Sequence, residues 1–299
     1  MLYYILVPLL AFVLTMMVAG NNLSAAVGTI IGSRILSSAG GALIGALGFS
    51  LGLVVQGRSL HGTAASLLPD NNMIVSLALL VSLVIFIMAT ILRVPLSLIM
   101  ALVGSSIGLS LRYHFHINDS LVLLIIFTWV LAPILSVTLA YLINRKFSRM
   151  KPKNVWNFAL MLKIALIIIS FLTAFTLGAN TLGFIAEVGR IKGYEILLLV
   201  LAIFLGSFLL SGGVVKRVGN DMYTMRYSNA FVSLLVSSVL VEGATLFGIP
   251  LSNTQTLTSS VFGSGLSYRL KFLEARAFYI TVGMWILSPV LGIILGFLA

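Results

Sequence analysis

Residues 244–252 of this chain read Ala-Thr-Leu-Phe-Gly-Ile-Pro-Leu-Ser, and residues 89–97 read Ala-Thr-Ile-Leu-Arg-Val-Pro-Leu-Ser. Extended without a gap to Tyr268 and Tyr113, the two stretches share 10 identities in 25 positions. Composition alone would give roughly two or three identities, so the match indicates an internal repeat. A proline lies at the same place in both copies, where it favours the first turn of a helix.

A weaker pair of matches lies earlier in each copy. It relates Leu14-Thr15, Gly20 and Asn22 to Leu172-Thr173, Gly178 and Asn180. Because both pairs occur in the same order, we divide the chain into a first repeat (1–143), a basic linker (144–157) and a second repeat (158–299).

The composition of the chain places both repeats in a membrane. Of the 299 residues, 60% are hydrophobic and 8% are charged, whereas a soluble domain carries about 25% charged residues. Uncharged runs long enough to cross a bilayer occur at 1–33, 35–57, 121–143, 164–186 and 196–215. The predicted fold is therefore all-α: a multi-pass bundle of ten to twelve segments in the cell membrane, arranged as two inverted repeats with broken or half helices.

The net charge of +11 has two interpretations. Nucleic-acid binding is one, but the basic residues lie between apolar runs and form no separate basic domain. The other is the positive-inside rule, which places the linker and its cluster Arg145, Lys146, Arg149, Lys151 and Lys153 in the cytoplasm. We adopt the second. The chain has no cysteine, which excludes disulfides, thiolate metal sites and cysteine catalysis.

We expect helices throughout the chain. In the first half they cover 2–19, 22–33, 39–56, 73–92, a stretch from Pro95 to about 111, and 121–143. In the second half they cover 158–177, 181–190, 195–213, 228–247, 251 to about 267, and 277–298.

Two helix interruptions with polar side chains occupy matching positions in the repeats. The first is Gly20-Asn21-Asn22, followed by Ser24, and the second is Gly178-Ala179-Asn180-Thr181. Glycine and asparagine tolerate non-helical backbone, and a broken helix exposes free carbonyl and N–H groups. The alternative is a kink or a close helix crossing. We interpret the pair as a site in which Asn22, Asn180 and Thr181 contact substrate and Asn21 and Ser24 contact a coupling ion.

The segment after Pro250 carries the densest polar run in the chain. It reads Leu251-Ser252-Asn253-Thr254-Gln255-Thr256. Its hydroxyl and amide groups, together with the unpaired N–H groups of a helix start, would form a neutral cradle for an oxyanion. The alternative is an ordinary helix start at the membrane surface. We assign Ser252, Asn253, Thr254 and Gln255 to substrate, with Ser97 as their counterpart in the first half.

Glu242 is the sole acid in the otherwise apolar run from Tyr227 to Ser267. A carboxyl group inside a membrane helix is costly and often functional, so we assign it a role in ion coupling, as a proton carrier. The alternative is an ion pair with Arg226 or Arg93.

These motifs together resemble the inorganic phosphate transporters of the PiT type, whose members have two inverted repeats. Gly178-Ala179-Asn180 matches the start of the family's G-A-N-D-x-A-N signature, and Gly20-Asn21-Asn22 resembles it more loosely. The stretches from Pro95 and Pro250 resemble the P-V-S-T-T-H signature, and Ala101-Leu102-Val103-Gly104 resembles the tail that follows it. The resemblance implies symport of phosphate with sodium or protons.

The chain also departs from those signatures. Leu23 and Thr181 stand where the family has the aspartates that resemble coupling groups, and Met100 and Gln255 stand where it has histidine. These departures leave the coupling ion open between a proton and sodium. They leave the substrate open between phosphate and another tetrahedral oxyanion such as sulfate.

The expected function is therefore a symporter of phosphate, without cofactor or metal, that acts on inorganic phosphate in the lipid bilayer. Neither nucleic acid nor catalysis is expected, because the chain shows no paired acids, histidine cluster or Ser-His pair in an apolar segment. A membrane-embedded enzyme and a passive channel are the alternatives of another class. The oligomeric state is open, and a homo-oligomer is one alternative.

Overall fold

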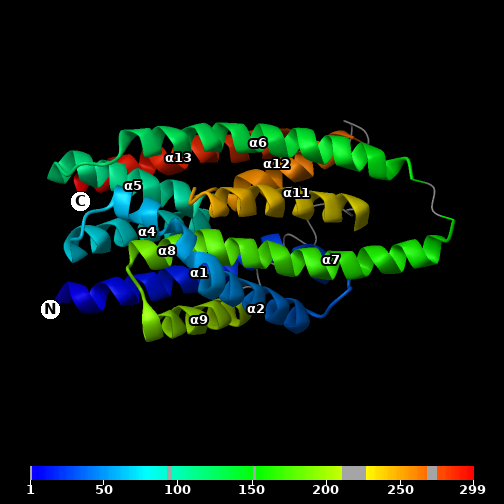
Figure 1. Cartoon of the computed structure of the whole chain (residues 1–299), viewed down its shortest axis with the longest axis horizontal. Coiled ribbons are helices and arrows are strands. Elements are labelled where there is room, and N and C mark those ends of the chain that lie inside the picture. Colours follow the sequence, from blue (N-terminus) through cyan, green and yellow to red (C-terminus); the bar gives the residue numbers. More distant parts are fainter. Residues whose placement is uncertain (1, 93–95, 151–152, 211–226, 268–274) are drawn as a thin grey trace.

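The computed structural model describes residues 2–92, 96–150, 153–210, 227–267 and 275–299, and every regular element in those ranges is helical (Figure 1). The first half contains α1 (Leu2–Gly32), α2 (Ser38–Gln56), η1 (Gly57–Leu60), α3 (His61–Leu67), α4 (Asn72–Leu92), α5 (Leu98–Tyr113) and α6 (Asp119–Ser148). The second half contains α7 (Val155–Leu177), η2 (Gly178–Leu182), α8 (Gly183–Val188), η3 (Gly193–Glu195), α9 (Ile196–Leu205), η4 (Gly206–Leu210), α11 (Tyr227–Leu246), α12 (Asn253–Leu266) and α13 (Ala275–Leu298).

The bundle has the dimensions and surface of a multi-pass membrane protein. Within the described residues, 8 helical stretches are long and apolar enough to span a bilayer, and α5 and α12 are shorter. On α6, exposed apolar residues recur at helical spacing, namely Leu123, Phe127, Val130 and Ile134. An apolar stripe exposed on a long helix has lipid as its solvent, so the predicted membrane bundle is confirmed.

The main contacts between a helix of one half and a helix of the other have counterparts elsewhere in the bundle. The pair α5 and α13 has its counterpart in α12 and α6, and the pair α2 and α7 has its counterpart in α9 and α1. Helix α4 packs on α5 as α11 packs on α12. Figure 1 also shows α1 and α7 running in opposite directions along the bundle, as do α6 and α13. This is the arrangement that two inverted repeats would produce.

A glycine lies at a point of close approach in both the α5–α13 pair and the α12–α6 pair. A Cβ atom added to Gly108 of α5 would lie 2.2 Å from the carbonyl oxygen of Ile293 on α13. A Cβ atom added to Gly263 of α12 would lie 2.2 Å from the carbonyl oxygen of Val137 on α6. Only glycine permits so close an approach of two helix backbones, which explains these two residues.

The expected break at Gly20-Asn21-Asn22 is wrong, because α1 is one continuous helix through this stretch. Gly20 has a different role there. A Cβ atom on it would lie 2.6 Å from Leu210 Cβ and 2.8 Å from the Gly206 carbonyl oxygen, so this glycine lets η4 approach α1. The alternative of a close crossing with a small residue is the correct one for this motif.

The second expected break is a π-helical turn rather than an interruption. Gly178–Leu182 adopts π geometry between α7 and α8, and the three elements form one apolar stretch of 34 residues. A π turn inserts one extra residue into a helix and is common at functional sites. The helix therefore continues in the same direction, and the extra residue turns the Asn180 and Thr181 side chains away from the positions that a regular α-helix would give them.

The other boundaries differ by a few residues from the expected ones. Helix α12 begins at Asn253, two residues later than expected, and α6 extends to Ser148 instead of 143. Asn144 thus belongs to α6, where it is buried and donates to the Ser264 carbonyl oxygen at 3.0 Å. Helix α7 already begins at Val155, so the connection between the halves is shorter than the predicted linker. The end of the expected helix 195–213 lies outside the described residues.

Candidate functional site

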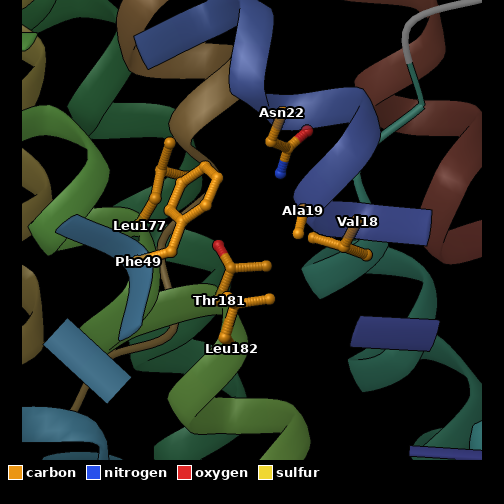
Figure 2. Close-up of a pocket in the computed structure, with 7 residues that line it drawn as sticks. All are labelled: Val18, Ala19, Asn22, Phe49, Leu177, Thr181 and Leu182. Atoms are coloured by element: carbon orange, nitrogen blue, oxygen red, sulfur yellow. The ribbon is translucent and has the colours of Figure 1, made fainter. Parts of the chain in front are cut away.

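A small cavity lies between α1, α2 and the π turn η2. Seven residues line it, and in this conformation it is partly open and too narrow to admit a water molecule (Figure 2). Its lining is Val18, Ala19, Asn22, Phe49, Leu177, Thr181 and Leu182. Five of the seven are apolar, so Asn22 and Thr181 supply its polar groups.

Asn22 and Thr181 come from the two matching motifs and face each other in this cavity. Figure 2 shows the Asn22 amide and the Thr181 hydroxyl both directed into the space between them. Thr181 is buried, and Asn22 is half-buried on α1. The structure thus brings these two predicted residues together, even though α1 does not break at Asn22.

Asn180 holds the loop that precedes α12. Its Nδ2 donates to Thr245 Oγ1 at 2.8 Å and to the Ile249 carbonyl oxygen at 3.1 Å. Its Oδ1 accepts from the Leu251 backbone N–H at 3.1 Å. The side chain is fully buried and binds protein on both sides, so Asn180 positions the start of α12 in this conformation.

The start of α12 is a cluster of buried polar groups, as predicted. Ser252 occupies the N-cap position, and its hydroxyl lies 2.8 Å from Thr254 Oγ1 instead of bonding to the backbone. Gln255 Nε2 donates to the Trp129 carbonyl oxygen at 3.4 Å. Trp129 Nε1 in turn donates to the Pro250 carbonyl oxygen at 3.0 Å, so α6 also holds this loop.

Two side chains of this cluster keep buried atoms without a partner among the described residues. They are Asn253 Nδ2, a donor, and Gln255 Oε1, an acceptor. A buried polar atom without a partner costs about 1–3 kcal/mol, and native proteins contain few. The cluster thus offers both a free donor and a free acceptor, next to the free N–H groups that every helix start presents.

The corresponding helix start in the first half is simpler. Ser97 caps α5 by accepting from the Met100 N–H at 3.4 Å, and its own N–H donates to Ser288 Oγ at 3.1 Å. The following residues Leu98, Ile99 and Met100 are buried and apolar. Ser97 therefore has a structural role in this conformation, and the polar cluster belongs to the second half.

Glu242 lies on α11, one helical turn before Thr245, and has a partner that the sequence did not indicate. Its Oε1 accepts from Gln56 Nε2 at 2.6 Å, while its Oε2 is buried without a partner among the described residues. The alternative partners Arg226 and Arg93 both lie outside the described residues. Ser24 Oγ donates to the Asn21 carbonyl oxygen at 3.1 Å. The described hydrogen bonds do not join these two residues to Glu242.

Trp129 could have been found from the sequence. The stretch Trp129-Val130-Leu131-Ala132-Pro133 recurs 156 residues later as Trp285-Ile286-Leu287-Ser288-Pro289. It is a third pair of the internal repeat, in the order expected of it. Thr245, which matches Thr90 in the first repeat, could have been found in the same way, whereas Gln56 gives no such signal because it reaches Glu242 only through the packing of distant helices.

Known proteins resemble this chain over almost its whole length. The sequence pattern of the Phosphate transporter family matches residues 18–296. The chain is 26% identical over 293 residues to a Methanocaldococcus jannaschii protein named "Putative phosphate permease", covering 97% of this chain and 94% of that one. It is 24% identical over 296 residues to the sulfate permease CysP of Bacillus subtilis, covering 95% of this chain and 83% of that one.

A solved structure, "The sodium-dependent phosphate transporter", superposes with a TM-score of 0.89 at 18% identity, covering 100% of this chain and 98% of that one. This likeness confirms the fold of the bundle. The family match extends over almost the whole chain, and the family consists of transporters rather than enzymes. This multi-pass membrane protein therefore belongs to the phosphate transporter family.

Proposed function

We propose that this protein is a secondary transporter that carries inorganic phosphate across the membrane in symport with a cation. The observation that carries the proposal is the neutral polar cluster at the start of α12, held by Asn180 and Trp129 in the middle of an apolar bundle. Asn22 and Thr181 add polar groups from the neighbouring cavity. The two halves would rock around this site to expose it to each side in turn.

A neutral site suits an anion that must be released as readily as it is bound. The N–H groups of a helix start and the helix dipole favour negative charge without a buried cation. The hydroxyl groups of Ser252 and Thr254 and the free Nδ2 of Asn253 add donors around it. Such a site holds the anion by several hydrogen bonds of moderate strength. These bonds offset the free-energy cost of removing the anion from water, and the anion can still dissociate.

The free acceptor in the cluster favours phosphate over sulfate. Phosphate at neutral pH keeps one or two protons and can donate a hydrogen bond, whereas sulfate cannot. Because Gln255 Nε2 is engaged with Trp129, its Oε1 is fixed as an acceptor, and it has no partner among the described residues. A hydrogen bond from a phosphate hydroxyl to Gln255 Oε1 would satisfy it.

Sulfate is the second candidate substrate. The B. subtilis relative is named a sulfate permease, and the donors of the α12 cluster would suit any tetrahedral oxyanion. Gln255 separates the two candidates, because replacing it by Met retains the volume and removes the acceptor for a phosphate hydroxyl. The contact of Nε2 with Trp129 is also lost, but it is lost for both substrates alike. This change should lower phosphate uptake more than sulfate uptake, by about tenfold if one hydrogen bond is lost.

For the coupling ion we favour a proton bound by Glu242. This residue carries a buried carboxylate oxygen without a partner among the described residues, and the chain lacks the two signature aspartates. Sodium remains the alternative, since Gln56 and Glu242 together offer oxygen ligands, which a hard cation prefers.

Uptake into proteoliposomes tests the proposal. Labelled phosphate and sulfate are offered separately, with either a proton or a sodium gradient imposed. We expect phosphate accumulation, and we expect the double variant Ser252→Ala with Asn253→Ala to abolish it. Thr258→Ala on the same helix, half-buried and outside the cluster, is the matched control and should keep full uptake. Undiminished uptake in the double variant would remove the α12 cluster from the site.

Glu242→Gln tests the coupling separately. The variant keeps the shape of the side chain and its contact with Gln56 but cannot carry a proton at this position. It should lose accumulation driven by a proton gradient while still exchanging phosphate across the membrane. Accumulation equal to that of the unmodified chain would exclude Glu242 as the proton carrier.

A further inference from the structure

One face of α12 is polar along its whole length. Asn253, Thr256, Ser260, Ser264 and Ser267 follow one another at spacings of three or four residues, so they form a single stripe along the helix. All but Ser267 are buried. These five residues, which we call the hydroxyl stripe, begin in the α12 cluster and end at the C-terminus of the helix.

Neighbouring helices direct further polar groups at the hydroxyl stripe. From α11, Ser237 Oγ lies 3.0 Å from Asn253 Oδ1 and 2.8 Å from Thr256 Oγ1. Ser233 Oγ lies 3.0 Å from Ser264 Oγ further along. From α6, Asn144 Nδ2 donates to Ser267 Oγ at 2.6 Å. Polar side chains thus follow the interface from the cluster to its far end.

Several of these buried groups are left without a partner among the described residues. Ser260 Oγ, in the middle of the hydroxyl stripe, is one, and it is fully buried. Asn253 Nδ2 and Asn144 Oδ1, at the two ends, are also unpaired. Each buried polar atom without a partner lowers the stability of the folded bundle, whereas an apolar side chain at the same place would pack without that cost. Groups of this kind are expected where a polar solute or water is accommodated in another conformation.

The corresponding interface in the first half has no such stripe. The positions 155 residues before the four buried members lie on α5, and they are Leu98, Ala101, Ser105 and Leu109. Three of these are apolar. Ser105 is the counterpart of Ser260, but its hydroxyl donates to the Leu102 carbonyl oxygen at 2.8 Å. The polar interface is therefore a property of the second half and not a consequence of the repeat.

The far end of the hydroxyl stripe lies beside the strongest positive charge in the described chain. Asn144 is followed on α6 by Arg145, Lys146 and Arg149, all of which are exposed. Basic residues at the mouth of a polar passage raise the local concentration of anions. The positive charge of these residues attracts a negatively charged solute. The uncharged hydroxyl stripe then offers that solute hydrogen bonds without binding it too tightly to be released.

We infer that the hydroxyl stripe, together with Ser233 and Ser237 of α11, lines the route by which the anion moves between its site and the basic end of the bundle. The inference rests on the proposed function, since it assumes a transported oxyanion. In this structure the route is closed by the hydrogen bonds between α11 and α12. It opens when these helices separate, and the unpaired hydroxyl of Ser260 then contacts the passing anion.

Cysteine accessibility tests this route, because the chain has no cysteine of its own. Ser260→Cys and Ser264→Cys are treated with a membrane-impermeant, negatively charged thiol reagent, added to one side of proteoliposomes at a time. Lys153→Cys, exposed just before α7, marks the basic side. Both variants should react only from the side that labels Lys153→Cys, and added phosphate should slow the reaction.

Ser105→Cys is the matched control and should stay unreactive from both sides. Reaction of Ser260→Cys from the opposite side, or no reaction from either side, would overturn the route. Labelling does not depend on which anion is carried. Failure of phosphate uptake in the unmodified chain would therefore contradict the proposed function while leaving the labelling result to decide the route.

A substitution that blocks the passage gives a second readout. Ser260→Leu should lower phosphate uptake by about tenfold or more, because a larger apolar side chain fills the passage. This variant should still bind phosphate when purified in detergent, which distinguishes a blocked passage from a lost site. Equal uptake by Ser260→Leu and the unmodified chain would also overturn the route.

Discussion

Asn180 is the residue on which the geometry of the site depends most. It donates to Thr245 and Ile249 and accepts from Leu251, and so it joins the π turn to the start of α12. The sequence indicated a substrate ligand at this position. The structure gives it a positioning role, because a side-chain amide can serve two acceptors and an N–H donor at once.

Replacing Asn180 by Ala should destabilise the protein. The change leaves the Leu251 N–H and the Ile249 carbonyl oxygen without a partner, at about 1–3 kcal/mol for each buried group. We expect a lower thermal unfolding midpoint in detergent and a loss of phosphate uptake. Asn21→Ala, one of the half-buried amides of α1, is the control and should unfold at the unmodified temperature. An unchanged midpoint for Asn180→Ala would contradict the positioning role.

At the residue scale, the sequence indicates which polar side chains lie in apolar segments, but it does not indicate their hydrogen-bond partners. Asn22, Thr181 and the Ser252–Gln255 run could be predicted because polar side chains in apolar segments are costly and therefore meaningful. The Gln56 partner of Glu242 could not be predicted, because it is 186 residues distant and belongs to another helix.

At the scale of single elements, glycine in a membrane helix has two interpretations that the sequence does not separate. Gly20 and Gly178 were both interpreted as helix breaks, and both are in fact points of close backbone approach. The helical penalty of glycine, about 1 kcal/mol, is small beside the cost of unpaired backbone groups in lipid. Helix α1 therefore continues through Gly20 without a break.

Substitutions at Gly108 and Gly263 test the element packing. An added methyl group would lie 2.2 Å from a carbonyl oxygen in each case, so the paired helices must move apart. We expect Gly108→Ala and Gly263→Ala each to destabilise the protein by about 1–3 kcal/mol, measured by thermal unfolding in detergent.

Gly283→Ala on α13 is the matched control for these two variants. No atom lies within 4 Å of a Cβ atom added there, so the change should be neutral or stabilising. If all three variants unfolded at the same temperature, the close backbone contacts would not contribute to stability.

For the whole molecule, the distribution of charge indicates its orientation in the membrane. Arg145, Lys146 and Arg149 lie at the end of α6. Asp119 and Glu195 begin α6 and α9 at the opposite end, where both chain termini are located (Figure 1). From the positive-inside rule we predict that the basic end faces the cytoplasm and that both termini face outside.

Single cysteines test this orientation in whole cells. Tyr194→Cys, exposed before α9, should react with an impermeant thiol reagent added outside, and Lys153→Cys should react only after the cells are opened. Labelling of Lys153→Cys in intact cells would reverse the orientation. The opposite directions of α1 and α7 are those expected of two inverted halves (Figure 1).

We propose that Asn22, Thr181 and the start of α12 enclose one oxyanion site. Crystals or cryo-EM grids prepared with arsenate, a heavier analogue of phosphate, locate the ion directly. We expect arsenate within hydrogen-bonding distance, about 3 Å, of the Ser252–Gln255 turn and of the Asn22 and Thr181 side chains. An arsenate ion bound elsewhere in the bundle, with these groups unliganded, would contradict it.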